Sequence, residues 1–192
     1  MKETRGITRM MSTLAGAALG LAVMLAFAGD AVGQGTAQGH THERQGFWFN
    51  TGLGYGSLGL EDASDREDGL SGNLALGGTI SPRFLLGVGT TGWTKEVEGI
   101  RINFGTLVLL GRFYPNADGG FFLNLGLGAG QVSVSEGSTT VSENGGGAVL
   151  GLGYDVRVGP NWSLTPFANA IGFDINGGQA DVFQFGLGVS FH

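Results

Sequence analysis

The sequence predicts an all-β protein: an eight-stranded antiparallel up-and-down β-barrel that crosses a membrane and follows a cleaved signal peptide. Three observations lead to this prediction: an apolar N-terminal stretch, a repeated alternation of apolar and small residues, and the composition. Glycine supplies 39 of the 192 residues, and charged residues supply only 14%. An ordinary soluble domain has about 7% glycine and about 25% charged residues.

The composition also excludes several classes of protein. The chain has no cysteine, so it can form neither a disulfide framework nor a cysteine-anchored lipoprotein. Its formal net charge of −6 argues against nucleic acid as a partner, because nucleic acid requires a basic surface. The glycines follow no three-residue period and are interleaved with Leu, Val, Phe and Tyr, which excludes collagen and flexible linkers.

The first 33 residues have the three parts of a secretory signal peptide, with an apolar stretch of 15 residues at 14–28. We expect cleavage after Gly33 or after Ala28. The alternative is an uncleaved anchor, but a spanning helix needs about 20 apolar residues. No later apolar run approaches that length, so the mature chain can enter a membrane only as a closed barrel. The basic residues at the start of the signal are Lys2, Arg5 and Arg9.

Residues 34–45 are polar and show no period, which predicts a short flexible periplasmic arm before a barrel domain at 46–192. The arm contains His40 and His42. Two histidines alone do not make a metal site, because three or four ligands are normally required. We therefore expect these histidines to be inert.

Eight strand-like segments of 11 to 15 residues follow. A strand that crosses a bilayer at a tilt needs about 9 to 11 residues, so each segment is long enough. The segments are 46–60, 69–80, 84–95, 101–114, 121–135, 146–158, 162–175 and 181–191.

The first four segments differ in how clearly they alternate. In the first, the odd-numbered residues from Phe49 to Tyr55 lie opposite Asn50 and three glycines. The second and third are separated by a turn sequence, 81–83. In the fourth, residues 107–110 are apolar on both faces, which predicts a bulge or a partly buried stretch.

Alternation is clearest in the last four segments. The odd-numbered residues 121–129 of the fifth and 183–191 of the eighth are apolar, as are the even-numbered residues 148–158 of the sixth. The opposite positions are mostly glycine or polar residues. The seventh segment contains Pro166, which removes a ladder donor, so we expect this residue at a bulge or near the rim.

The connections alternate in kind. Those after the second, fourth and sixth segments, at 81–83, 115–120 and 159–161, carry three of the four prolines. The other connections are more variable, such as the acidic stretch 61–68. This asymmetry predicts tight periplasmic turns, looser external loops and both termini in the periplasm.

The face opposite the apolar one shows which side contacts lipid. A soluble barrel needs charged side chains on its exterior, whereas this face carries Gly, Ser, Asn and Gln. Small residues suit the interior of an eight-stranded barrel. Arg112, Asp155 and Arg157 are the inward charges, and we expect them to form a salt-bridge cluster in the lumen because buried charges need partners. The alternative is that they lie near the rims in contact with water.

Aromatic residues lie at the ends of several segments, where a girdle at the membrane interface is expected. Trp93 and Phe173 are possible members of a second girdle at the outer rim. The residues predicted for the periplasmic girdle are Phe47, Trp48, Phe49, Tyr114, Phe121, Trp162 and Phe191.

A family resemblance rests on three stretches of the sequence. They are Leu109–Pro115, Phe122–Gly128 and the closing run Phe185–Phe191. On these runs, residues 46–192 resemble the small OmpA-like eight-stranded outer-membrane barrels. The closing run is similar to the terminal signal recognised by the outer-membrane assembly machinery, although here His192 follows the final aromatic residue. The residues that carry the signal are Phe185, Gly186, Leu187, Gly188, Val189 and Phe191.

The resemblance implies location in the cell outer membrane, with its lipids and the assembly machinery as partners. We expect a monomer with a non-enzymatic structural or surface-interaction role, presenting short acidic loops. These loops could bind divalent cations or contact lipopolysaccharide through a bridging metal, or simply be solvated. They lack the spacing of an EF-hand. The acidic loop residues are Glu61, Asp62, Asp65, Glu67 and Asp68.

Other functions are less favoured by the sequence. The histidines are His40, His42 and His192, none on the outer half of a strand, so a serine–histidine enzyme acting on lipid A is not expected. We expect no catalytic, cofactor or metal site. A narrow low-conductance pore remains an alternative, although water-filled channels need about 16 strands. A soluble periplasmic lipocalin-like barrel that binds a small ligand is the other alternative.

Overall fold

The computed structural model describes residues 44–60, 65–137, 139–175 and 178–192. The predicted signal peptide, the arm up to residue 43 and the histidines of the arm lie outside the described residues. Glu61 and Asp62 of the acidic loop also lie outside them. Within the described part of the chain, no helix is long and apolar enough to cross a membrane.

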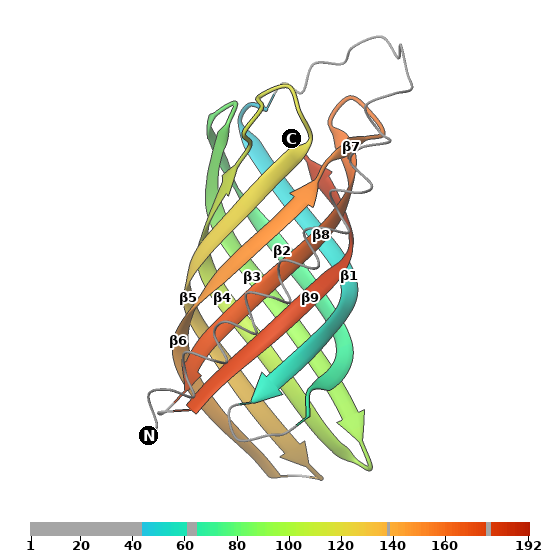
Figure 1. Ribbon diagram of the computed structural model, residues 1–192, viewed down its shortest axis with the longest axis vertical. Helices are drawn as coiled ribbons and strands as arrows, with labels where there is room; N and C mark the ends of the chain where they lie inside the picture. Colours follow the sequence, from blue (N-terminus) through green and yellow to red (C-terminus); the bar gives the residue numbers. More distant parts are fainter. Residues whose placement is uncertain (1–43, 61–64, 138, 176–177) are drawn as a thin grey trace. The chain divides into compact units, whose positions relative to one another are not determined.

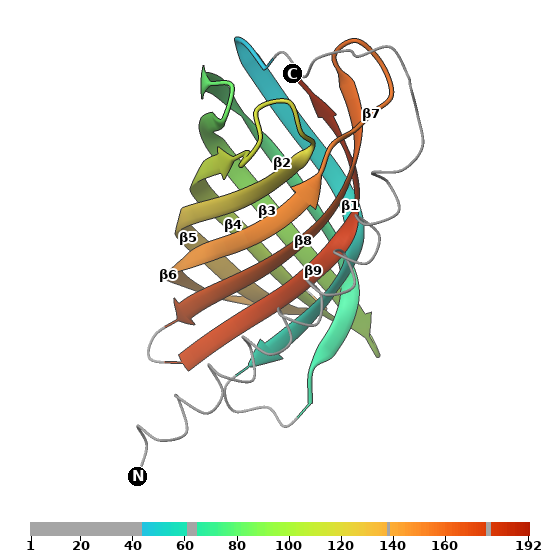
Figure 2. The same cartoon turned by 45° about the horizontal axis from the view of Figure 1, so that its top comes forward.

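Eight long antiparallel strands form one closed sheet (Figure 1). Each strand pairs with the next along the chain, and the last pairs with the first, so the predicted eight-stranded barrel is confirmed. A two-residue strand, β7, continues the line of β6 along β8. Figure 2 shows the barrel tilted, with β8, β9 and β1 side by side. The strands are β1 (Phe47–Leu60), β2 (Glu67–Ser81), β3 (Phe84–Val97), β4 (Ile100–Phe113), β5 (Phe121–Glu136), β6 (Thr139–Tyr154), β7 (Val156–Arg157), β8 (Trp162–Ile175) and β9 (Gly178–Phe191).

The barrel has two unlike ends. The terminal end holds the start of β1, the end of β9 and the connections at 82–83, 114–120 and 158–161, and it is the upper end in Figure 1. The hairpin end holds the other four connections. One of these is a two-residue turn in which both Glu98 (φ 51°) and Gly99 (φ 85°) are left-handed, as a type I′ hairpin turn requires.

The prediction of tight turns at one end and looser loops at the other is therefore wrong for most of the barrel. Three of the four hairpin-end connections have two residues between their strands, whereas 114–120 at the terminal end has seven. The reason is that the strands continue to pair far toward the hairpin end. β6 begins at Thr139, seven residues before its predicted start, and its polar first residues pair with Ser133–Glu136 of β5.

The positions of irregular strand pairing differ from the sequence prediction. β4 has no bulge: residues 107–110 keep a regular register with both neighbours, with Val108 and Leu110 facing inward and Leu107 and Leu109 outward. The register shift lies instead in β2, between Thr79 and Ser81. Pro166 faces the gap between β6 and β7, where the register is unchanged, so the missing N–H interrupts the ladder without adding a residue.

Glycines on the inner face leave room for aromatic rings. A Cβ at Gly130 would lie 2.5 Å from Cε1 of Phe173, and a Cβ at Gly147 would lie 2.7 Å from Cδ1 of the same ring. Trp93 lies over Gly56 in the same way. Trp93 and Phe173 are 2% and 3% exposed. The prediction that they form an outer girdle is therefore wrong, because both rings fill the lumen.

The polarity of both faces changes along the strands. In the terminal half, the outer face carries exposed Leu125 and Leu127, while Asn124 lies buried inside. In the hairpin half, the outer face carries Gln131 and Ser133, while Val132 packs inward against the core. The hairpin half therefore resembles a soluble barrel, whereas the terminal half is apolar outside and carries buried polar and charged side chains inside, beside rings such as Phe122.

Candidate functional site

The main polar cluster lies inside the terminal end and is centred on Asp155. This carboxylate lies between β6 and β7, where the inward phase of β6 carries it into the lumen, and is 1% exposed. Tyr114 donates to Oδ2 from its hydroxyl at 2.7 Å, and Thr165 donates to Oδ1 at 2.7 Å. His192 Nε2 lies 3.1 Å from Oδ2. The Asp155 carboxylate thus joins the 114–120 connection, strand β8 and the last residue of the chain.

The network continues across the lumen to β1. Thr165 Oγ1 lies 2.8 Å from Ser190 Oγ, which also accepts a hydrogen bond from Asn50 Nδ2 at 2.9 Å. Because β8, β9 and β1 are neighbours, these bonds join the strands that close the barrel. The network fixes the first and last strands to one another from the inside.

Burial and neighbouring charges set the protonation states at this end. Burial lowers the pKa of His192 despite the nearby Asp155 carboxylate. At neutral pH the histidine is therefore neutral and donates from Nε2 to Asp155.

Arginines surround this network. Arg112 donates from Nε to Asn124 Oδ1 at 3.0 Å, and its guanidinium carbon lies 3.9 Å from the ring centre of Phe122 and 5.0 Å from that of Trp48. Arg44, just before β1, donates to the carbonyl oxygens of two residues of the 114–120 connection and lies over the Tyr114 ring at 3.4 Å. These contacts close the terminal end of the lumen.

The predicted charge cluster is built differently from the expectation. Arg112 and Asp155 are both buried inside the barrel, and Arg157 is half-buried. Among the described residues, Asp155 is hydrogen-bonded to the neutral His192, and no salt bridge joins it to either predicted arginine. The expected direct salt bridges are therefore wrong. The sequence reasoning missed Arg44 and His192 as members of the cluster.

The predicted girdle is also partly wrong. Trp48 and Tyr114 are fully buried, so they face the lumen and not the outer surface. Phe49, Trp162 and Phe191 contact one another on the outer face, with ring centres 5.2 to 5.9 Å apart. Phe47 extends this group at 6.5 Å from Phe49, and Phe121 is half-buried opposite Tyr154.

The period-two alternation of the strands would have placed these misassigned residues on the inner face. Trp48 shares its parity with the inward Asn50, and Tyr114 shares its parity with Arg112. His192 likewise follows the inward Ser190. Arg44 precedes the first strand by three residues, and no sequence pattern placed it.

The hairpin end carries paired charges. Arg66 contacts Asp181 at 2.6 Å, Arg101 contacts Glu96 at 2.7 Å, and Lys95 is bonded to Glu67. Exposed pairs of this kind contribute about 0 to 1 kcal/mol each. Of the predicted acidic loop, Glu67 is therefore paired with a lysine of β3. In the described parts of the chain, no three His, Cys, Asp or Glu residues are grouped so as to hold a metal ion.

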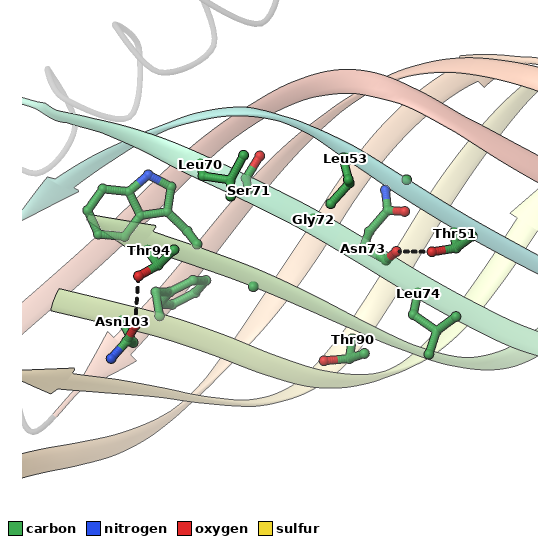
Figure 3. Close-up of a pocket in the computed structure, with 14 residues that line it drawn as sticks. Thr51, Leu53, Leu70, Ser71, Gly72, Asn73, Leu74, Thr90, Thr94 and Asn103 are labelled. Atoms are coloured by element: carbon green, nitrogen blue, oxygen red, sulfur yellow. Dashed lines mark hydrogen bonds between the residues drawn. The ribbon is translucent and has the colours of Figure 1, made fainter. Parts of the chain in front are cut away.

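A shallow cavity of about 460 Å³ lies along the wall formed by β1 to β4 (Figure 3). Glycines that include Gly72 and Gly92 line it, and Leu53, Leu70 and Leu74 border it. Thr94 donates to Asn103 Oδ1 at 2.8 Å, the bond drawn at one side of Figure 3. None of its lining residues is titratable, so the cavity has no group for acid–base or metal chemistry.

The Asp155 cluster does not form a nucleophile–base pair. The hydroxyl that lies 3.4 Å from His192 Nε2 belongs to Tyr114, and it donates to the carboxylate. The other ring nitrogen of His192, Nδ1, is buried and has no protein partner. A nucleophile would need to contact that nitrogen for the histidine to act as its base. The arrangement is one of structural hydrogen bonds.

No protein-family model matches the chain, and no curated protein matches it. Solved structures do. Neisserial surface protein A matches with a TM-score of 0.62 at 15% identity, covering 76% of this chain and 96% of that one. Ail, the attachment invasion locus protein of Yersinia pestis, matches with a TM-score of 0.56 at 15% identity, covering 77% and 99%. The N-terminal β-barrel domain of Pseudomonas aeruginosa OprF matches with a TM-score of 0.50 at 13% identity, covering 77% and 97%. At these identities the likeness concerns the fold, and the fold is that of the small eight-stranded outer-membrane barrels.

Proposed function

We propose that this protein is a non-enzymatic, OmpA-like integral barrel of the outer membrane. The terminal half lies in the lipid, and the hairpin half projects into water as a surface for contact with other molecules. The observation that carries this proposal is the change in the polarity of the outer face along the strands.

The exposed side chains support the lipid-facing half. Leu107, Leu109, Leu125 and Leu127 are 60 to 65% exposed on neighbouring strands. Contiguous apolar patches larger than a few hundred Å² are rare on soluble monomers. In the same half, the inner face carries buried polar and charged side chains, among them Asn124 and Arg112. This is the arrangement expected of a barrel whose exterior contacts hydrocarbon.

The same observation weighs against a soluble lipocalin-like barrel. Such a barrel would keep an apolar interior and a polar exterior along its whole length. Here that arrangement is confined to the hairpin half, where Phe104 and Val182 are buried inside and Asn103 lies outside. The soluble-like half suits a segment that extends beyond the lipid.

The filled lumen weighs against a pore. Phe122, Phe167 and Phe173 are buried inside the barrel, and Arg44 closes the terminal end against Tyr114. The inner-face glycines accommodate these rings, so they do not leave an open channel. We expect planar-bilayer recordings to show no conductance steps above the empty-membrane baseline, and discrete steps would contradict this.

The contact surface is the set of paired charges at the hairpin end. These pairs mix both signs, which favours a partner recognised by polar contacts over a strongly charged polymer. The terminal end would face the periplasm, and the closing run Phe185–Phe191, as strand β9, would be the part that the assembly machinery binds. Nothing in the Asp155 cluster calls for a cofactor or an enzymatic role.

The absence of cysteine from the chain provides a direct test. Single variants Ser135→Cys, Leu125→Cys and Asn161→Cys would be treated with a membrane-impermeant maleimide in intact cells. We expect labelling of Ser135→Cys in intact cells, of Asn161→Cys only after the outer membrane is opened, and of Leu125→Cys in neither case. The outer-membrane fraction should also migrate differently on a denaturing gel before and after boiling. A soluble periplasmic protein with no such shift would contradict the proposal.

A further inference from the structure

The terminal end of the lumen contains more buried positive charge than negative charge. Three arginines surround it: Arg44, Arg112 and Arg157. Among the described residues, the carboxylate that interacts electrostatically with these arginines is Asp155. His192 is neutral at pH 7, as argued above, so it does not change this balance. Uncompensated charge in a region of low dielectric is costly, and such groups are normally paired.

Several donors at this end also have no protein partner. Arg112 is 1% exposed, yet its Nη1 has none. The indole Nε1 of Trp48 is fully buried and unpartnered, as is Nε of Arg44. Arg157 adds two more such nitrogens, Nε and Nη1. Buried polar atoms in native proteins nearly always have a partner, and each orphan costs about 1 to 3 kcal/mol.

The free donors lie close to one another. The guanidinium carbon of Arg112 is 5.0 Å from the centre of the Trp48 ring, so the two side chains that carry free donors are neighbours. Water could accept from both donors, but it would leave the excess positive charge in place. An anion supplies acceptors and negative charge together, and hydrogen bonds to charged acceptors are about twice as strong as neutral ones.

We propose that the lumen at the terminal end binds a small inorganic anion, such as phosphate or chloride, between Arg112 and Trp48. Arg44 and Arg157 strengthen the positive field around it, and the aromatic rings of Phe122 and Tyr114 shield it from solvent. The site goes beyond the proposed surface role, because it uses no residue of the hairpin end.

Trp48 provides the signal for a direct test. The chain has three tryptophans, so the double variant Trp93→Phe, Trp162→Phe leaves Trp48 as the reporter. Inorganic phosphate and sodium chloride would each be titrated into the folded barrel in detergent micelles, with the ionic strength held by the sodium salt of a bulky sulfonate. We expect a saturable change in Trp48 fluorescence. The unfolding midpoint should rise with anion concentration in the way that mass action requires.

Two variants at the site and one control identify the residues involved. Arg112→Gln should weaken anion binding by at least about tenfold, the factor that corresponds to 1.4 kcal/mol. Trp48→Phe keeps an aromatic side chain but removes the five-membered ring with its N–H donor, so the rise in unfolding midpoint should need about threefold more anion. Arg101→Gln is the control, since Arg101 is exposed on β4 at the hairpin end and pairs with Glu96. This variant should bind as the parent does.

The proposal is overturned by a response that does not saturate, or by an equal response in the parent, Trp48→Phe and Arg112→Gln, because either result is a general effect of salt. Trp48→Phe decides the matter alone if Arg112→Gln does not fold. A Glu43→Gln variant completes the series, because Glu43 precedes Arg44 in the chain. Strong destabilisation of that variant, with no anion response in the parent, would show that a carboxylate of the chain itself supplies the missing charge.

Discussion

Because inner glycines lie against aromatic rings, replacing one of them by alanine should strongly lower the stability of the barrel. At Gly130, an added Cβ would lie 2.5, 2.6 and 2.9 Å from three atoms of the Phe173 ring, where carbon atoms normally lie about 3.5 to 4.0 Å apart. The ring cannot easily move away. It is buried against Phe104, with ring centres 5.3 Å apart, and its Cδ1 also approaches Gly147.

The expected magnitude has two parts of opposite sign. Overpacking a rigid core costs about 1 to 3 kcal/mol. Replacing glycine by alanine within a strand gains about 0.5 to 1 kcal/mol from reduced freedom of the unfolded chain. Gly105→Ala is the matched control, because a Cβ at Gly105 in β4 would meet nothing within 4 Å. The difference between Gly130→Ala and Gly105→Ala is therefore the packing cost alone, about 1 to 3 kcal/mol.

The assay is denaturant-induced unfolding in lipid vesicles, followed by tryptophan fluorescence and extrapolated linearly. Phe173→Leu, combined with Gly130→Ala, tests the cause. The double variant should recover part of the lost stability, with a coupling of at least about 0.5 kcal/mol. Equal stabilities of Gly130→Ala and Gly105→Ala would refute the conclusion that the inner glycines are cavities for rings.

Three further predictions concern the terminal and hairpin ends. Asp155→Asn keeps the shape of the side chain but removes its charge from among the arginines, and should cost about 3 kcal/mol in the same unfolding assay; a loss below about 0.5 kcal/mol would show that the carboxylate is not needed. Because the pKa of His192 is lowered in the folded state, the unfolded chain gains a proton below about pH 6.5 that the folded chain does not. Stability should therefore be full above that pH and fall on acidification. The decline just below about pH 6.5 should be absent in His192→Phe, and an unchanged slope would contradict the assignment. At the turn, Glu98 has a φ of 51°, so Glu98→Asn should stabilise the barrel by a few tenths of a kcal/mol and Glu98→Val should destabilise it, measured as changes in unfolding midpoint; the reverse order would exclude the left-handed turn.

The fold was accessible from the sequence because each long strand has its own period and its own turns. The predicted first and seventh segments differ from β1 and β8 by at most one residue at either end. The start of β6 was not accessible, since Thr139–Asn144 carries too few apolar residues for a pattern. Its strand structure comes from pairing with β5, which is a tertiary effect.

The candidate site was accessible only in part, for a similar reason. Alternation predicts which residues of a strand face inward, and it therefore identifies Arg112 and Asp155 as inward residues. It does not predict the register between strands that are distant in the sequence. Which ring meets which glycine, and that Asp155 accepts from His192 and not from Arg112, depend on that register. Residues outside the strands, such as Arg44, carry no period at all.

The sequence also contains a feature that marks where the polarity of the outer face changes. Along β5, the apolar positions are odd-numbered up to Ala129 and then even-numbered, at Val132 and Val134, while the strand itself continues without a bulge. The same exchange occurs in β9, where apolar residues are even-numbered up to Val182 and odd-numbered from Phe183 onward. Because the backbone keeps its period, the proposed placement, with hydrocarbon outside the terminal half and water outside the hairpin half, accounts for this change in phase. It also explains why strands of 14 to 16 residues are used where about 9 to 11 would cross the bilayer. The extra residues of each strand form the water-exposed half, in which the inner face takes over the apolar core.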